Sequence, residues 1–539
     1  MQQPEPLSSN FNMFIDDIDR GVIKIPQFQR EFVWSIEQSA KLIDSILKGY
    51  PIGTFILWES DEQLRSIRNI GGAQLPETPA GTKVQYVLDG QQRMTSLYAS
   101  LKGLQIQKGN RVEQFSNIHI DLVADEDDTL VLTDVSGRDK DEVISLITLM
   151  EGSLSTIFQY PAHVHDKIQM YKDRLKTYRF STILMRSASL DIATEVFTRL
   201  NVGGKSLTVF EIMVAKTYDE LKKFDLSEKY QKFIDEVETV GYETISDSTL
   251  LQTVAVLLEG ECTGKTILKL EKQSFIDIWP KAVDALYKAI ELFRHTFRIP
   301  VSKLLPYNGL LVPFAYFFYK HPKKPVGEQL KYLEDFFWRI VVTERYSTGL
   351  ETKIAQDIKK IDSILQNKLP KYETLVDVSK EMIINNGWFS VNRSFIKGML
   401  CLMAYSEPKS FNDNSIVQIS NDWLKQGNSK NYHHFFPKAF LKKKEEDEFY
   451  INHIVNITIV DDFLNKNVIR AKAPSNYMSS FKSDNKELED TMKTHLIDDL
   501  DAYGVWDDDY DLFFDKRAER LSEELSKRII SSKSTTKQL

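Results

Sequence analysis

The feature that most constrains the fold is a change in hydrophobic periodicity along the chain. From about Ile192 to Leu400, apolar residues recur with the period of amphipathic helices, whereas strand-like and helix-like stretches alternate before that region. A chain of 539 residues is also too long for one ordinary domain. We therefore predict an α+β protein with an N-terminal α/β domain at residues 1–215, a largely helical domain at residues 216–410 and a C-terminal domain at residues 411–539.

Composition excludes several classes of protein. No stretch reaches the roughly 18 consecutive apolar residues that a membrane helix needs, and the start MQQPEPLSSN lacks the basic and apolar parts of a signal peptide. Cys262 and Cys401 are the only cysteines and lie far apart, so neither a disulfide framework nor a cysteine-based zinc site is expected. We expect a cytoplasmic protein that does not bind membranes.

Charge is unevenly distributed. The net charge is -8, which does not favour a nucleic-acid partner, but residues 430–486 contain ten Lys and Arg against seven Asp and Glu. Phosphate contact depends on such local excess, so DNA stays open as a partner. The basic residues expected to contact DNA are Lys438, Lys466, Arg470 and Lys472.

Local patterns predict the elements of the N-terminal domain. The residues before FNMFIDDIDRG look irregular, and that segment predicts a short helix ending at Gly21. A helix is expected after Ser35, stopped by Gly49, and GTFILWE reads as a strand. VQYVLDGQQRMTSL predicts a strand, a tight turn and a helix, and TYRFSTILM predicts a further strand.

The turn in VQYVLDGQQRMTSL predicts an anion-binding site. A strand that ends in Asp89-Gly90 and a helix that starts near Gln91 would place main-chain N–H groups, Gln92 and Arg93 at a helix N-terminus. Glycine allows the backbone to approach a ligand closely, and an arginine in IPQFQREFVW, Arg30, adds a second guanidinium.

A third segment, FTRLNVGGKSL, repeats the theme with Arg199, Asn201 and a Gly-Gly turn. Each segment alone has an ordinary structural interpretation, because arginines pair with carboxylates and Gly-Gly turns connect helices. Together and in this order, IPQFQR, DGQQR and FTRLNVGGKSL resemble the ParB/sulfiredoxin-like domain of GmrSD-type restriction systems across residues 10–215.

This resemblance implies nucleotide binding and hydrolysis in the N-terminal domain, without distinguishing among GTP, ATP, CTP and UTP. In many members of the family an HNH domain follows on the same chain or on a partner chain. The resemblance therefore leaves open whether the chain forms a homo-oligomer or binds a partner defence protein. The nucleotide-binding residues implied are Arg30, Asp89, Gly90, Gln91, Gln92, Arg93, Arg199 and Asn201.

The strongest chemical signal lies near the C-terminus. NYHHFFPKAFL places His433 and His434 before two aromatics and a proline, and the strand-like VNITIV follows with Asn456 at its start and Asn465 beyond it. Two adjacent histidines alone would favour a core edge with ordinary loop asparagines. The whole order resembles the ββα-metal, or HNH, nuclease motif, in which a hairpin and a helix hold one divalent metal.

By this resemblance His434 is the general base and Asn456 holds it in place, while His433 and Asn465 bind Mg²⁺ or Mn²⁺. A neutral imidazole suits the deprotonation of water, and a metal neutralises charge on the leaving oxygen. Many family members have Asp in place of His433 and His in place of Asn465, which leaves the metal preference open. Asp461 and Asp462 are rival ligands, and His453 is interpreted as structural or DNA-facing.

The helical region carries one further polar segment, ERYSTGLETK at residues 344–353. Arg345 and Tyr346 could contact DNA or nucleotide, but a solvated helix end is the favoured interpretation of this segment.

The sequence thus favours a nucleotide-regulated, metal-dependent DNA endonuclease that acts against phage or foreign DNA. The alternative is a nucleotide-switched DNA-binding protein with an inactive HNH fold. Strand scission in the presence of a divalent metal separates the two.

Overall fold

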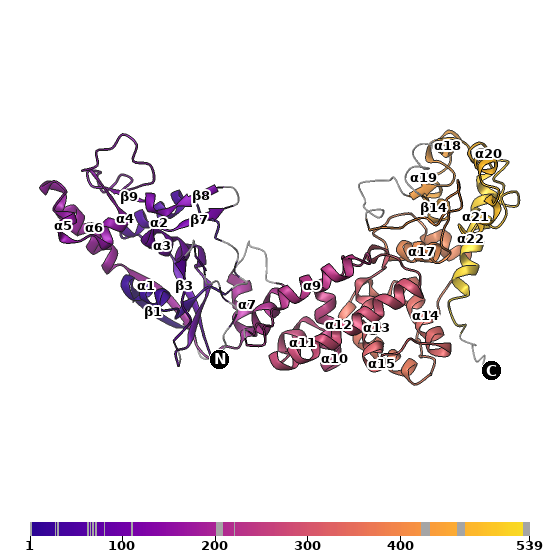
Figure 1. Ribbon diagram of the computed structural model, residues 1–539, viewed down its shortest axis with the longest axis horizontal. Helices are drawn as coiled ribbons and strands as arrows, with labels where there is room; N and C mark the ends of the chain where they lie inside the picture. The colour runs from indigo at the N-terminus through magenta and orange to yellow at the C-terminus, as the bar shows by residue number, and fades with distance from the viewer. Residues whose placement is uncertain are drawn as a thin grey trace. The chain divides into compact units, whose positions relative to one another are not determined.

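The computed structural model describes residues 3–26, 29, 32–61, 64, 66, 69–70, 73–79, 81–108, 111–200, 208–219, 221–421, 432–460, 469 and 471–531. The chain divides into two compact units, Met1–Asp225 and Leu226–Leu539 (Figure 1). Both contain helices, and strands occur in each, so the predicted α+β class is confirmed at that level. None of the described helices has the length and apolar character needed to cross a bilayer.

A mixed five-stranded sheet organises the first unit, in the order β1-β12-β3-β6-β2. The pairs β1–β12 and β3–β6 are antiparallel, and the pairs β12–β3 and β2–β6 are parallel. The strands are β1 (Glu5–Asn10), β2 (Ile23–Lys24), β3 (Thr54–Ser60), β6 (Val84–Asp89) and β12 (Arg179–Met185). The strands predicted from GTFILWE, VQYVLD and TYRFSTILM are therefore confirmed, and they are adjacent.

Smaller sheets and helices complete this unit. The short strands are β4 (Asn69–Ile70), β5 (Ala73–Gln74), β7 (Gln105–Lys108), β8 (Arg111–Gln114), β9 (His119–Asp121), β10 (Val131–Leu132) and β11 (Val143–Ser145). The helices are α1 (Phe11–Asp19), α2 (Ile36–Leu47), α3 (Gln91–Lys102), α4 (Leu146–Glu151), α5 (Leu154–Ile157), α6 (His165–Thr177), α7 (Leu190–Leu200) and α8 (Val209–Thr217).

Aromatic packing joins the helices to the large sheet. The ring of Phe14 on α1 lies 4.8 Å from that of Phe55 on β3 and 4.9 Å from that of Phe180 on β12. Helix α2 begins at a capping box, in which Ser35 and Gln38 each accept a main-chain hydrogen bond from the other residue. These contacts fix the sheet that carries the turn between β6 and α3.

Helices dominate the second unit up to Tyr405, as the sequence predicts. They are α9 (Leu226–Glu238), α10 (Asp247–Glu259), α11 (Gly264–Lys269), α12 (Lys272–His295), α13 (Leu311–Lys320), α14 (Gly327–Val342), α15 (Leu350–Leu365), α16 (Lys380–Asn386) and α17 (Ser394–Tyr405). Helix α13 packs on both α12 and α15. The ring of Phe293 on α12 lies 4.8 Å from that of Phe314 on α13 and 5.7 Å from that of Phe337 on α14.

The C-terminal part of this unit mixes short strands and helices, which gather together in Figure 1. They are β13 (Tyr432–His434), α18 (Lys438–Lys443), α19 (Glu448–Ile451), β14 (Ile457–Ile459), α20 (Pro474–Asp484), α21 (Leu488–Lys493) and α22 (Tyr510–Ser526). Helix α16 packs on α22 and α17 packs on β14, so this part is continuous with the helical part. The division at residue 410 stays a prediction.

Candidate functional site

The two adjacent histidines lie on a short β-hairpin. Strand β13 pairs antiparallel with β14, with His433 opposite Thr458 and His434 opposite Ile457. Successive side chains of a strand point to opposite faces, so the two imidazoles have different surroundings. His433 is 1% exposed, whereas His434 is only partly buried.

One contact fixes the protonation pattern of His434. Its Nε2 lies 3.1 Å from Oδ1 of Asn452, and Nδ2 of Asn452 donates to the carbonyl oxygen of Phe389 at 3.1 Å. Because that donation orients the amide, Nε2 of His434 must carry the hydrogen, and Nδ1 keeps a lone pair. Burial, aided by the nearby charge of Lys438, lowers the pKa of His434 to about 4, so the ring is neutral near pH 7.

In His433 the other ring nitrogen, Nδ1, carries the hydrogen. The Thr458 hydroxyl donates to the carbonyl oxygen of His433 at 3.4 Å, and its oxygen lies 2.9 Å from Nδ1 of the same residue. Nδ1 is therefore the protonated nitrogen, which leaves a lone pair on Nε2. That atom is buried and has no hydrogen-bond partner among the described residues. Burial, with the nearby charges of His434, His495 and Arg517, holds the pKa of His433 well below its usual range.

Asn456 acts on the main chain of the loop that follows His434. Its Oδ1 accepts from the N–H of Phe436 at 2.8 Å, and its Nδ2 donates to the carbonyl oxygens of Phe436 at 3.0 Å and Ile451 at 3.1 Å. Among the described residues, the hydrogen bond to the His434 imidazole comes instead from Asn452. Asn456 thus positions the segment after His434, and Asn452 is a residue that the sequence interpretation missed.

Arg517 is a second residue without a sequence signal. It lies fully buried on α22 and donates to the carbonyl oxygens of Val455 and, at 3.2 Å, His495. Burial lowers its pKa to about 9. Its hydrogen bond to Val455 helps to hold the 3-10 turn Ile454–Asn456, and with it the Asn456 amide.

The interpretation of His453 as structural agrees with its contacts. Nδ1 accepts from the N–H of Val455 at 3.2 Å, so Nε2 donates to the carbonyl oxygen of Ile384 at 3.0 Å. A Cβ at Gly387 would lie 2.1 Å from this ring, so the glycine allows the close approach. With both nitrogens used, His453 has no atom left for catalysis.

Several predicted residues of the C-terminal site lie outside the described residues: Asp461, Asp462, Asn465, Lys466 and Arg470. Lys472 is exposed just before α20, and Lys438 opens α18 close enough to influence His434. Burial lowers the pKa of Lys438. This half-buried cation beside the imidazole suits a phosphate oxygen.

In the first unit, the turn between β6 and α3 has the predicted strand-turn-helix form. Gly90 adopts a positive φ of 95°, and a Cβ there would lie 2.6 Å from Cδ1 of Phe55. No side chain of the described residues caps the N-terminus of α3, and Gln91 and Gln92 in its first turn are buried. The geometry suits an anion held by main-chain N–H groups.

The guanidinium of Arg93 is bound to other groups of the protein. It donates to the carbonyl oxygens of Ile52 at 2.7 Å and Thr54 at 3.0 Å, and pairs with Asp89 at 3.0 Å. Arg93 therefore ties β3 to the turn. A role in binding phosphate stays a prediction, and it would require some of these bonds to be exchanged.

The first two motifs meet in space. Nε2 of Gln29 donates to the carbonyl oxygens of Val87 at 2.8 Å and Leu88 at 3.2 Å, and the N–H of Val33 donates to Oε1 of Gln92 at 2.9 Å. Gln29 and Val33 of the first motif thus lie at the end of β6, beside the turn that carries DGQQR. Arg30 itself is outside the described residues.

The third motif is reached through α7, which packs against β6. Arg199 is 77% exposed on its side chain and pairs with Glu195 at 2.5 Å. Asn201 lies outside the described residues. The structure therefore brings the first two motifs together, and it places the helix carrying Arg199 beside the same strand.

The three motifs fall within a stretch of the chain that matches a known family. Residues 11–218 match the family model described as GmrSD restriction endonuclease, N-terminal domain. We refer to them as the GmrSD-type domain. The family suggests endonuclease activity with DNA as substrate, in a restriction system that defends against phage.

A second similarity extends past the GmrSD-type domain. An uncharacterized protein of Methanocaldococcus jannaschii, MJ0686, is 25% identical over 511 residues, which cover 85% of this chain and 84% of that protein. The similarity to MJ0686 therefore covers more of this chain than residues 11–218 alone.

Among the described residues of the C-terminal site, His433 is a candidate metal ligand. Its buried Nε2 has a lone pair and no partner among the described residues, and Thr458 orients the ring, as expected for a ligand. Within the described ranges no cluster of three His, Cys, Asp or Glu side chains could hold an ion. His433 therefore fits one ligand position.

Proposed function

We propose that the protein is a metal-dependent DNA endonuclease, controlled by a nucleotide that binds the GmrSD-type domain. The observation that carries the proposal is the state of His434, a neutral imidazole whose Nε2–H is held by Asn452. Nδ1 is then the free base, which is the state required to take a proton from water at neutral pH.

The reaction proposed for these residues is hydrolysis of a phosphodiester. Nδ1 of His434 accepts a proton as the water oxygen forms a bond to phosphorus and the bond to the leaving oxygen breaks. Asn452 stabilises the resulting imidazolium through Nε2–H, and Lys438 lies near enough to attract the phosphate. Asn456 and Arg517 keep the adjoining main chain in place.

A divalent metal completes the proposal. His433 through Nε2, with Asn465 by the HNH resemblance, would hold it. When bound, such an ion supplies positive charge against the leaving oxygen. Because imidazole suits transition metals better than Mg²⁺, the His433 ligand favours Mn²⁺.

The nucleotide is proposed to bind at the N-terminus of α3. Main-chain N–H groups after Gly90 provide the anion site, and Gln91 and Gln92 lie in the same first turn. Arg30, Arg199 and Asn201 would complete it, as the family resemblance implies. Binding or hydrolysis there would license cleavage of phage or foreign DNA.

A plasmid-cleavage assay tests the proposal. Supercoiled DNA is incubated with the full chain, Mg²⁺ or Mn²⁺, and each of the four nucleoside triphosphates. Metal-dependent nicking or linearisation that responds to a nucleotide is expected. Tight DNA binding without scission under any metal would instead support a nucleotide-switched DNA-binding protein.

A further inference from the structure

A basic pocket lies in the helical part of the second unit, and it is lined by none of the residues of the two sites described above. It has a volume of about 820 Å³ and is formed by α14, the 3-10 turn Arg345–Ser347, α15 and the segment that follows α15. Two arginines and five lysines line it, against the carboxylates of Asp357 and Glu373. In a protein of net charge -8, this is a marked local excess of positive charge.

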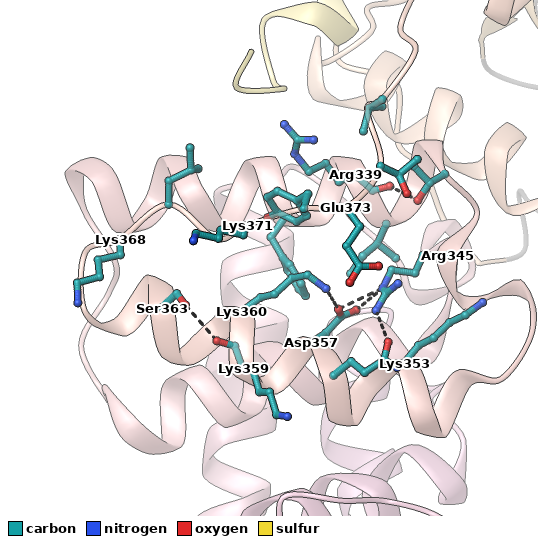
Figure 2. Close-up of a pocket in the computed structure, with 18 residues that line it drawn as sticks. Arg339, Arg345, Lys353, Asp357, Lys359, Lys360, Ser363, Lys368, Lys371 and Glu373 are labelled. Atoms are coloured by element: carbon teal, nitrogen blue, oxygen red, sulfur yellow. Dashed lines mark hydrogen bonds and ion pairs between the residues drawn. The ribbon is translucent and has the colours of Figure 1, made fainter. Parts of the chain in front are cut away.

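The floor of the basic pocket is a buried, preorganised ion cluster. Asp357 is 0% exposed, and its carboxylate accepts from Nε of Arg345 at 2.9 Å and from Nζ of Lys360. Figure 2 shows Arg345 and Lys360 converging on this carboxylate. One carboxylate between two cations leaves the floor positive.

The remaining lysines add charge that the described residues do not neutralise. Among the residues that the structure describes, Lys353, Lys359, Lys368 and Lys371 form no ion pair. Nζ of Lys353 donates to the hydroxyl oxygen of Thr348, and Nζ of Lys368 donates to Oε1 of Gln366; both acceptors are neutral. Cations gathered around a hollow focus a positive potential there, which an anion would relieve.

An aromatic and apolar wall accompanies these charges. The ring of Tyr372 lies 4.3 Å from the guanidinium carbon of Arg339, which the buried Asp335 orients through Nε at 2.8 Å. Phe336, Ile340 and Leu369 add apolar surface. A hollow with an apolar wall, a few fixed charges and this volume has the size and character of a small-molecule site.

These contacts correct the interpretation of residues 344–353 as a solvated helix end. Tyr346 is 3% exposed, and Arg345 is tied to the floor of the basic pocket. The segment is part of a built cavity.

We propose that the basic pocket binds a nucleotide carrying more than one phosphate, at a site separate from the GmrSD-type domain. The rim lysines and Arg345 take the phosphates, and the base lies against the wall made by Tyr372 and its apolar neighbours. Flexible lysines contact phosphates as point charges, while the fixed arginine offers directed donors. A cavity of this volume favours a small ligand over the broad contact that a DNA duplex makes.

Hydrogen exchange of the full chain locates the ligand directly. ATP, GTP and inorganic tripolyphosphate are the probes, with tripolyphosphate reporting the phosphate contribution alone. Protection of peptides spanning residues 345–376 is expected with a nucleotide, and weaker protection with tripolyphosphate. Protection confined to residues 85–95 would overturn the proposal, as would protection of 345–376 by a DNA duplex but by none of the three probes.

A charge reversal supplies the matched test. Lys359→Glu with Lys371→Glu changes two rim lysines that form no ion pair among the described residues, so folding should be preserved. Nucleotide affinity at the basic pocket, measured by calorimetry, should fall by about tenfold or more. The control is Lys265→Glu with Lys281→Glu, which makes the same charge change at exposed positions outside the basic pocket. Equal affinity in the two variants would refute the assignment.

Discussion

Removing the Asn452 side chain should cripple the base without unfolding the protein. In Asn452→Ala, Nε2–H of His434 loses its 3.1 Å acceptor, so the proton is free to move to Nδ1, the atom that must stay unprotonated. A lost hydrogen bond with an unsatisfied donor costs about 1–3 kcal/mol. That range corresponds to a fall in kcat of about 5- to 160-fold.

Asn452→Asp provides the complementary change, since a carboxylate keeps an acceptor but adds a negative charge. An opposite charge at this distance should raise the pKa of His434 by about 1–3 units from its value of about 4. A base works only when deprotonated, so the acid limb of the pH–rate profile should move from about pH 4 to about pH 5–7.

The assay is plasmid nicking across a pH series with saturating Mn²⁺, together with circular dichroism to check folding. Asn386→Asp is the matched control, because that exposed amide donates to the carbonyl oxygen of Met382, whereas the His434 imidazole is bound by Asn452. Wild-type kcat in Asn452→Ala, together with an unshifted acid limb in Asn452→Asp, would refute the assignment of Nδ1 as the base.

Three further outcomes are expected. Loss of solvent contact lowers the pKa values of His433, His434, His453 and His495, so the unfolded chain takes up protons at a higher pH than the folded chain. The stability that depends on these neutral histidines should be complete above about pH 6.5 and lost progressively towards about pH 4. Urea titrations at each pH measure this, and a flat profile would contradict it. Gly90→Ala should destabilise the first unit by about 2 kcal/mol or more, because the added Cβ strains the left-handed backbone and clashes with Phe55. Gly81→Ala has the same kind of backbone strain but meets no atom within 4 Å, so it should cost only about 1–2 kcal/mol in the same thermal melts. Cleavage should be faster with Mn²⁺ than with Mg²⁺ at equal saturation because His433 supplies an imidazole ligand, and the reverse order would count against that ligand.

Much of the local structure could be predicted because side-chain pattern and turn chemistry agree. The run VQYVLDGQQRMTSL combines a β-branched strand, a glycine at the turn and a helix, and the structure has β6, Gly90 and α3 there. Strand β1 was missed because EPLSSN has weak strand propensity. It forms through its pairing with β12, which is a tertiary effect that local sequence does not encode.

The site could be predicted only in part for the same reason. The HHFFP segment marks His433 and His434, but their different protonation patterns depend on Thr458 and Asn452, which reach them through the hairpin and the loop before it. From the sequence, Arg93 is expected to be available to donate to a phosphate. In the structure it donates instead to the carbonyl oxygens of Ile52 and Thr54, near the start of β3, which no local sequence pattern indicates. The buried Arg517 likewise has no pattern around it in sequence.

The central claim is that His434 is the base of a DNA-cutting site, and its direct test is a comparison of two histidine variants. Plasmid cleavage is measured for His434→Ala and for His295→Ala, whose exposed ring pairs with Glu291. Cleavage should fall by about 100-fold or more in His434→Ala and stay at the wild-type rate in His295→Ala, while nucleotide hydrolysis is unchanged in both. Cleavage by His434→Ala at the wild-type rate would contradict the claim.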